Sequence, residues 1–173
     1  MTTTAVRIVG PTDGKLGQLG GISVRFMVDG AASGGGFSLV EHPMEPRALA
    51  APMHRHSRED EYTFILEGRV GADLGGEIVY GEVGDLIFKP RGQWHTFWNA
   101  GDVPARILEI ISPAGFEKFF DEVTDLAARG ELDPGRMAAK AAEYGVELDL
   151  SSVPGLMTAH GVTFAAGAPP EQR

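Results

Sequence analysis

The sequence contains no cysteine, which excludes disulfide bonds, thiol catalysis and metal sites built on thiolate ligands. It also lacks any cluster of lysine and arginine longer than a pair, and its net charge is -9. Because phosphate backbones are bound through such basic clusters, we expect no nucleic-acid partner. No apolar run is long enough to cross a membrane, and the first residues have no features of a secretion signal. We therefore expect a cytoplasmic protein without membrane association.

The chain does contain a pattern of short strands that are separated by glycines. Its 173 residues suffice for one domain with its own hydrophobic core. Short segments of alternating apolar and polar residues recur at intervals of about 8–12 residues, which is typical of a sandwich or barrel of strands. The strands predicted in this way cover residues 22–28, 37–42, 62–66, 77–80, 85–88, 95–98 and 106–111.

The pattern changes after residue 113. Apolar residues recur at helical spacing from Phe116 to Ala127, and a second helix is predicted between Asp133, an N-cap, and Gly145, a stop signal. The last residues are rich in Ser, Ala, Gly and Pro and predict an extended tail. We therefore divide the chain into N-terminal strands that extend a sheet or contact a second copy (1–36), a barrel core (37–113), C-terminal helices (114–150) and a tail (151–173).

Two segments of the barrel core together supply three imidazoles and a carboxylate. The first reads H-x-H-x4-E-x6-G from His54, and the second reads G-x5-P-x-G-x2-H-x3-N from Gly84. His54 and His56 are two residues apart, so on a strand both rings point to the same face, which Glu61 can share after a short bend. His95 has to reach them from a second strand. Nitrogen and oxygen donors of this kind suit divalent transition metals.

These two patterns resemble, position for position, the two signature motifs of the cupin superfamily. The flanks are more loosely similar to single-domain, quercetin-dioxygenase-like cupins, the monocupins with a conserved cupin 2 barrel. The one departure is Ala48, where the family usually has glycine. The resemblance covers roughly residues 37–113. It implies a mainly-β fold, the double-stranded β-helix or jelly-roll barrel, to which the helical pattern adds two C-terminal α-helices.

We predict that one divalent transition metal ion, Fe, Mn, Ni, Cu or Zn, is the cofactor. Glu59 and Asp60 compete with Glu61 for the position of acidic ligand; the fixed distance to Gly68 favours Glu61, and the other two are predicted to be solvated. The alternative is that the imidazoles are satisfied by hydrogen bonds in a barrel that holds no metal. The predicted metal ligands are His54, His56, Glu61 and His95.

Strand parity predicts the walls of a pocket around the metal. Thr63 and Ile65 share the face of Glu61, and Gln93 and Phe97 share that of His95. The far wall is formed by Leu108 and Ile110, or else by Ile107 and Ile111, and core packing is the alternative for each of these side chains. Such a pocket predicts a compact, partly hydrophobic guest. The predicted pocket residues are Thr63, Ile65, Gln93, Phe97, Leu108 and Ile110.

Four protein donors leave one or two positions on the ion open for a substrate and for water or dioxygen. The resemblance implies a metal-dependent, dioxygenase-type oxidoreductase that acts on a small aromatic or enolisable compound, with Glu61 as the candidate catalytic base. The alternatives are a non-redox cupin, either an isomerase or a polyketide cyclase, and a non-catalytic small-molecule-binding cupin. We also expect a homodimer, and we interpret the isolated His42 and His160 as incidental.

Overall fold

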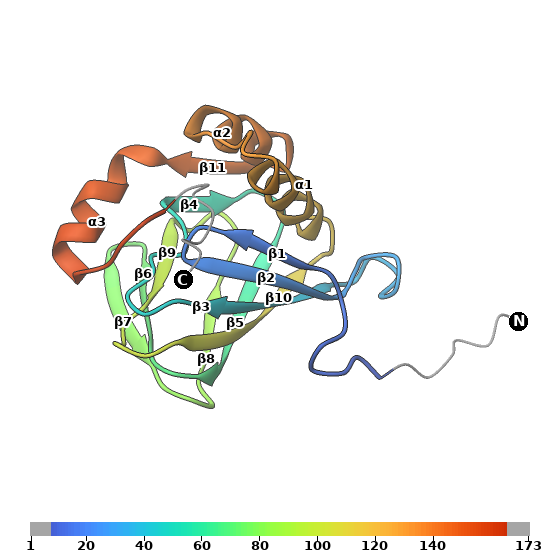
Figure 1. Cartoon of the computed structure of the whole chain (residues 1–173), viewed down its shortest axis with the longest axis horizontal. Coiled ribbons are helices and arrows are strands. Elements are labelled where there is room, and N and C mark those ends of the chain that lie inside the picture. The colour runs from blue at the N-terminus through green and yellow to red at the C-terminus, as the bar shows by residue number, and fades with distance from the viewer. Residues whose placement is uncertain (1–7, 166–173) are drawn as a thin grey trace, which may run out of the picture.

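Two antiparallel sheets face each other in the computed structural model, which describes residues 8–165 (Figure 1). One sheet has the strand order β1-β2-β3-β10-β5-β8, and the other has the order β11-β4-β9-β6-β7. The strands are β1 (Leu16–Leu19), β2 (Ile22–Val28), β3 (Ser38–Met44), β4 (Met53–His56), β5 (Asp60–Glu67), β6 (Val70–Leu74), β7 (Glu77–Gly81), β8 (Leu86–Lys89), β9 (His95–Asn99), β10 (Ala105–Ser112) and β11 (Val146–Asp149).

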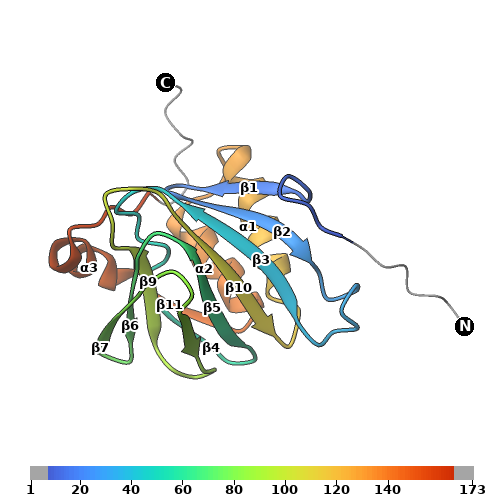
Figure 2. The ribbon, with the colours of Figure 1, turned by 90° about the horizontal axis from the view of Figure 1, so that it is seen from below.

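The inward faces of the two sheets share one core (Figure 2). Ile65 and Ile107 of the first sheet and Val70 of the second are fully buried, and Phe97 of the second is 7% exposed. They alternate with outward residues along each strand, which is the period that the sequence pattern predicts. The fold prediction, a mainly-β jelly-roll of the cupin type, is thereby confirmed.

Two helices follow the strands where the helical pattern predicts them, α1 (Glu117–Ala128) and α2 (Pro134–Glu143). Phe119 and Val123 of α1 are buried against Val24 of β2 and Val40 of β3, on the face of these strands that also carries His42. The side chain of Asp133 accepts a hydrogen bond from the Arg136 amide, as expected of an N-cap. No helix within residues 8–165 has the length and apolar character that a membrane span requires.

The C-terminal segment differs from its prediction. Residues 146–149, predicted to lie in the helical region, form β11 and pair with β4. The predicted tail contains a third helix, α3 (Val153–His160), with a proline in its first turn and Gly161 at its C-cap in the left-handed region. Leu156 of α3 packs with Trp98, which explains why so short a helix is stable. Residues 166–173 of that tail, like 1–7 of the N-terminal segment, lie outside the described residues.

The N-terminal segment adds two strands to the edge of the first sheet. β1 pairs with β2, and β2 pairs with β3, so both strands lie beside the barrel core and under α1 (Figure 1). Their apolar side chains help to fill the space between sheet and helices, since Val24 is fully buried there.

Gly71 lets the backbone of β6 approach the indole of Trp98. A Cβ atom at Gly71 would lie 2.3 Å from Cε2 of Trp98, which is itself only 1% exposed. We expect Gly71→Ala to lower the free energy of unfolding by about 1–3 kcal/mol, because the indole has no room to move. Urea denaturation followed by tryptophan fluorescence measures this. Gly155→Ala, in α3 with open space around it, is the control and is expected to leave stability equal or higher.

Candidate metal centre

Three imidazoles meet between neighbouring strands of the second sheet. His54 and His56 lie on the inward face of β4, and His54 is paired with His95 of β9 across the ladder. The ring centroids of His54 and His95 are 4.3 Å apart, and those of His54 and His56 are 5.3 Å apart. All three side chains are buried.

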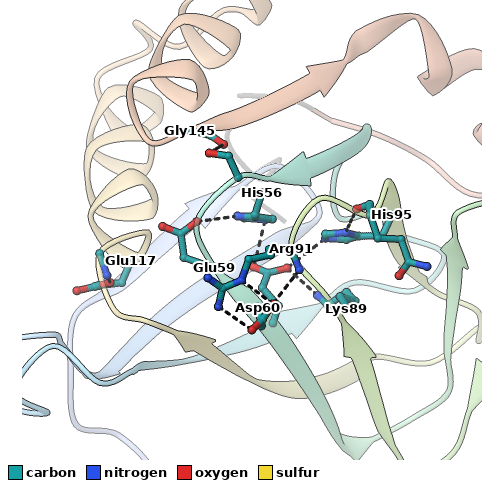
Figure 3. A network of polar contacts seen from close by, with 12 residues as sticks. His56, Glu59, Asp60, Lys89, Arg91, His95, Glu117 and Gly145 are labelled. Atoms are coloured by element: carbon teal, nitrogen blue, oxygen red, sulfur yellow. Dashed lines mark hydrogen bonds and ion pairs between the residues drawn. The ribbon is translucent and has the colours of Figure 1, made fainter.

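The carboxylate arrives from the opposite sheet. Glu61 lies on the inward face of β5, with Oε2 3.2 Å from Nε2 of His95 and Oε1 3.5 Å from Nε2 of His56 (Figure 3). One donor atom from each of the four side chains lies within 4.8 Å of all the others. The structure therefore brings the four predicted ligands together at one point.

Backbone carbonyls orient two of the rings toward that point. Nδ1 of His54 lies 2.9 Å from the carbonyl oxygen of Pro52, and Nδ1 of His95 lies 3.0 Å from that of Gln93. When each Nδ1 donates to its carbonyl, Nε2 keeps a lone pair, which is the tautomer of a metal-ligating histidine.

The third ring carries the observation that fits a metal best. Both ring nitrogens of His56 are buried, and within residues 8–165 neither has a hydrogen-bond partner of good geometry. Its Nδ1 faces Oε2 of Glu59 at 3.5 Å, and its Nε2 is directed at the centre of the cluster. A buried nitrogen without a partner costs free energy unless something binds it, and a divalent cation among these donors would do so.

The protonation states of His54, His95 and Glu61 suit metal ligands, whereas at His56 the effect of burial is outweighed by the carboxylates of Glu61 and Glu59, which raise the pKa. Burial, together with the neighbouring imidazoles, holds the pKa of His54 well below its usual range, and burial lowers that of His95. Burial opposes ionisation of Glu61, but the charges of His56 and Lys89 outweigh it and hold the pKa of this carboxyl well below its ordinary value. Two neutral imidazoles and one carboxylate are thus ready to coordinate, since ligands must give up their protons first.

The two rival acidic residues lie in different places. The side chain of Asp60 points outward and pairs with Arg91, with Oδ2 2.8 Å from Nη2 (Figure 3). Glu59 was predicted to be solvated, which is wrong: it is 4% exposed and lies against His56. Glu59 thus lies where a residue that contacts a metal ligand, and not the metal itself, can orient the ligating histidine.

An apolar cavity of about 80 Å³ opens on the cluster. His54 and Glu61 lie at its base, and side chains from α1, α2 and β11 close it from above. The free volume holds a compact group, and a ligand of ordinary drug size, which needs about 300–1,000 Å³, requires these side chains to move. The apolar lining includes Leu19, Ile22, Leu49, Phe97, Phe116, Phe119, Phe120, Met137, Val146, Leu148 and Phe164.

Of the predicted pocket residues, only Phe97 lines this cavity. Thr63 and Ile65 are fully buried inside the barrel, but Thr63 contacts Glu109 and Ile65 packs in the core. Gln93 is half-buried beside the turn at Gly75.

Leu108 and Ile110 were assigned to the wrong face of β10. The buried positions of this strand are Ile107, Glu109 and Ile111, which is the alternative parity. The sequence misled here because the inward face contains a glutamate, so that both faces of β10 look equally apolar.

The sequence prediction missed two buried charged residues next to Glu61, of which Glu109 lines the cavity. Lys89 of β8 and Glu109 of β10 are each 1% exposed, and Nζ of Lys89 lies 3.0 Å from Oε1 of Glu109 and 3.1 Å from Oε2 of Glu61. Strand parity contained the signal, because Lys89 is two residues from the buried Ile87 and Glu109 lies between two buried isoleucines.

His42 is also part of this cavity, contrary to its interpretation as incidental. It is 1% exposed, its Nδ1 lies 3.0 Å from the carbonyl oxygen of Ser23, and its ring packs edge-on against Phe120. His160, the other isolated histidine, stacks on Trp98 outside the barrel.

The burial of His42 predicts an acid-sensitive fold. Burial, aided by the charge of Lys89, lowers the pKa of His42 from 6.5 to about 4. The unfolded chain therefore binds this proton at a higher pH than the folded chain, so stability falls as the pH drops from about 6.5 to about 4, in total by about 3 kcal/mol. Urea denaturation at a series of pH values in this range should show that the free energy of unfolding falls more steeply with decreasing pH in the wild type than in His42→Asn. This variant keeps a donor for the carbonyl oxygen of Ser23. Equal slopes would contradict the assignment.

Comparison with known proteins agrees with this architecture. Residues 41–111 match the model of the family described as Cupin domain. The structure superimposes on an RmlC-like cupin from Shewanella frigidimarina with a TM-score of 0.55 and 16% identity, over 66% of this chain and 96% of that one. This likeness concerns the fold alone. Residues 41–111 are thus similar to the Cupin domain family, and the structure has the fold of known cupins.

Two relatives in sequence come from Streptomyces. The chain is 40% identical over 60 residues to the tetracenomycin polyketide synthase protein TcmJ of Streptomyces glaucescens, and 33% identical over 60 residues to the polyketide synthase CurC of Streptomyces cyaneus. Each match covers 35% of this chain, and it covers 40% of TcmJ and 39% of CurC. The chain thus spans about two fifths of the length of these curated relatives.

Proposed function

We propose that this protein is a metal-dependent cupin enzyme that binds a compact, enolisable aromatic compound of the polyketide type and forms its enolate. The observation that carries this proposal is the cluster of three imidazoles and a carboxylate, two of whose members, His54 and Glu61, line an apolar cavity. Among residues 8–165, both ring nitrogens of His56 in that cluster are buried without a hydrogen-bond partner of good geometry. Such a donor set in a concave apolar site is the usual composition of a small-molecule site with chemistry.

His54, His56, Glu61 and His95 would hold the metal. A divalent ion bound there supplies Lewis acidity, which lowers the pKa of a hydroxyl or of a C–H group next to a carbonyl. The chain's own residues provide the surroundings: Phe116 and Phe120 offer ring faces and exclude water. Lys89 places a buried positive charge beside Glu61, which favours anionic forms at the base of the cavity.

The polyketide class is suggested by the two Streptomyces relatives, whose names refer to polyketide synthases. Aromatic polyketides are rich in 1,3-dicarbonyl and phenolic groups, which are the groups that this donor set would activate. The cavity of about 80 Å³ accommodates one such group rather than a whole multi-ring compound.

A dioxygenase of the quercetin-dioxygenase-like kind is the second candidate. It is favoured by the all-nitrogen-and-oxygen donor set, which suits redox-active Fe, Mn, Ni or Cu and leaves positions free for two further ligands. In this version the enolate reacts onward with dioxygen in the same cavity.

One set of measurements tests both candidates. Protein purified without added metal is analysed by inductively coupled plasma spectrometry, and it is then assayed in D2O with flavonols, catechols, 1,3-diketones and α-hydroxy ketones. Deuterium uptake at the carbon next to a carbonyl, without oxygen consumption, supports enolate formation alone, whereas oxygen consumption supports the dioxygenase. Zinc as the sole bound metal contradicts the dioxygenase. Heat of binding without either reaction contradicts the enzyme and indicates a binding protein.

A further inference from the structure

Two carboxylates that line the cavity share one buried lysine. Nζ of Lys89 lies within 3.1 Å of both Glu61 and Glu109, and it lies 4.5 Å from the centre of the Phe97 ring. Glu61 is the predicted metal ligand of the pair. Glu109 has no part in the donor cluster, yet it lines the same cavity as Glu61 and His54.

The contacts of Glu109 leave it free to meet a ligand. Its carboxylate accepts a hydrogen bond from Oγ1 of Thr63 and pairs with Lys89, and among residues 8–165 it has no recorded polar contact with the four donor side chains. It is held by strands β5, β8 and β10 of the first sheet, whereas the three imidazoles belong to the second sheet. A ligand in the cavity would therefore lie between His54 and Glu109, which line it from opposite sheets.

The charges around Glu109 separate it chemically from Glu61. The groups that face it are Lys89 from β8, Glu61 from β5, His42 from β3 and, across the cavity, His54 from β4. Burial, only partly offset by Lys89, raises the pKa of Glu109 to about 7, while that of Glu61 stays well below its ordinary value. Two neighbouring carboxyls whose pKa values differ in this way are typical of a catalytic site. One group stays charged, and the other exchanges protons near neutral pH.

We propose that Glu109 is a further catalytic residue, the group that takes the proton from the bound ligand and returns it. This rests on the proposed enolate-forming function. The proton of a C–H group next to a carbonyl, or of a phenolic hydroxyl, passes to a carboxylate oxygen of Glu109. The electron pair stays on the ligand as the enolate or phenolate, and the reverse transfer completes the exchange. Thr63 and Lys89 act as positioning residues that hold the carboxylate toward the cavity.

The test compares Glu109→Gln with Glu41→Gln in metal-loaded protein. Glu41 is also a buried carboxylate, 5% exposed, but it pairs with Arg25 and Arg106 and does not line the cavity. The probe is deuterium uptake by 2-hydroxyacetophenone in D2O, followed by proton NMR. We expect Glu109→Gln to lower the exchange rate by about 10²–10⁴-fold, with metal stoichiometry unchanged, and Glu41→Gln to remain near the wild type.

The pH profile distinguishes proton transfer from a merely structural role. The wild-type rate should rise with pH through a midpoint near 7, and Glu109→Gln should lose that rise. Glu109→Asp, which keeps an ionisable group, should retain a rise at a shifted midpoint and serves if the glutamine variant does not fold. If both glutamine variants exchange deuterium as fast as the wild type, the proposal for Glu109 is overturned, whereas the proposed enzymatic function is not.

A measurement on the ligand-free protein tests the role of Glu109 independently of the proposed enolate-forming function. If Glu109 exchanges a proton near neutral pH, infrared difference spectra of the ligand-free protein between about pH 6 and about pH 8 should contain a protonated-carboxyl band that Glu109→Gln lacks and Glu41→Gln keeps. Absence of that band in the wild type overturns the proposal for Glu109 whatever the substrate. Presence of the band with no turnover of any probe supports the assignment of Glu109 as the proton-exchanging group and contradicts the proposed function alone.

Discussion

His56→Ala should abolish stoichiometric binding of a divalent transition metal. This imidazole is 1% exposed and directs Nε2 at Glu61, and in the described part of the chain neither of its nitrogens has a hydrogen-bond partner of good geometry. Changing a residue that only contacts a metal ligand already lowers metal affinity by about 10–100-fold, so loss of a direct donor should lower it by at least about 100-fold. Isothermal titration with Mn²⁺, Ni²⁺ or Zn²⁺ alone, after chelation of the purified protein, measures the change.

His160→Ala is the matched control for that experiment. His160 is an imidazole on α3 that stacks on Trp98, and it is not among the four clustered donors. Its loss should leave metal affinity within about threefold of the wild type, since it contributes no donor. Equal affinity of the wild type and His56→Ala would mean that any metal binds elsewhere, and the cluster would then be a set of buried histidines only.

The donor cluster was predictable from the sequence because spacing constrains it strongly. His54 and His56 must share one strand face, and β4 is short enough that no bulge interrupts the alternation. The partnership with His95 comes from the two motifs together, and the ladder pairing of His54 with His95 realises it. The positions of the donors thus follow from local strand geometry and from a resemblance that fixes which strands are neighbours.

The rest of the cavity was not predictable in the same way. Lys89, Glu109 and His42 are polar residues on inward strand positions, and although strand parity places Lys89 and Glu109 there, charged residues are rarely buried unless they are paired. Their burial depends on mutual compensation: a lysine between two carboxylates, and an imidazole on a backbone carbonyl. Such pairings join strands distant in sequence, so a local pattern can indicate an inward position but not the partner that compensates the charge there. The cavity roof depends likewise on how α1, α2 and β11 pack.

Lys89→Met should destabilise the metal-free protein by about 3–5 kcal/mol. The substitution keeps an unbranched side chain of similar length but removes the cation that Glu61 and Glu109 share, and breaking a buried ion pair from one side leaves an uncompensated charge. Urea denaturation with a chelator present measures the loss. Lys15→Met is the control: its ammonium group pairs with Asp121 and Asp125 at the surface, so it should change stability by less than about 1 kcal/mol.

The double variant Lys89→Met/Glu109→Gln shows which interaction accounts for the stability lost in Lys89→Met. If the penalty arises from carboxylates left without a cation, neutralising Glu109 removes one of them, and the double variant should be more stable than the sum of the single changes predicts by about 0.5–3 kcal/mol. If Lys89 matters only as packing against Phe97, the two changes should add, because a methionine fills nearly the same space. Additivity within experimental error would therefore contradict the shared-cation arrangement, and with it the electrostatic separation of Glu61 from Glu109.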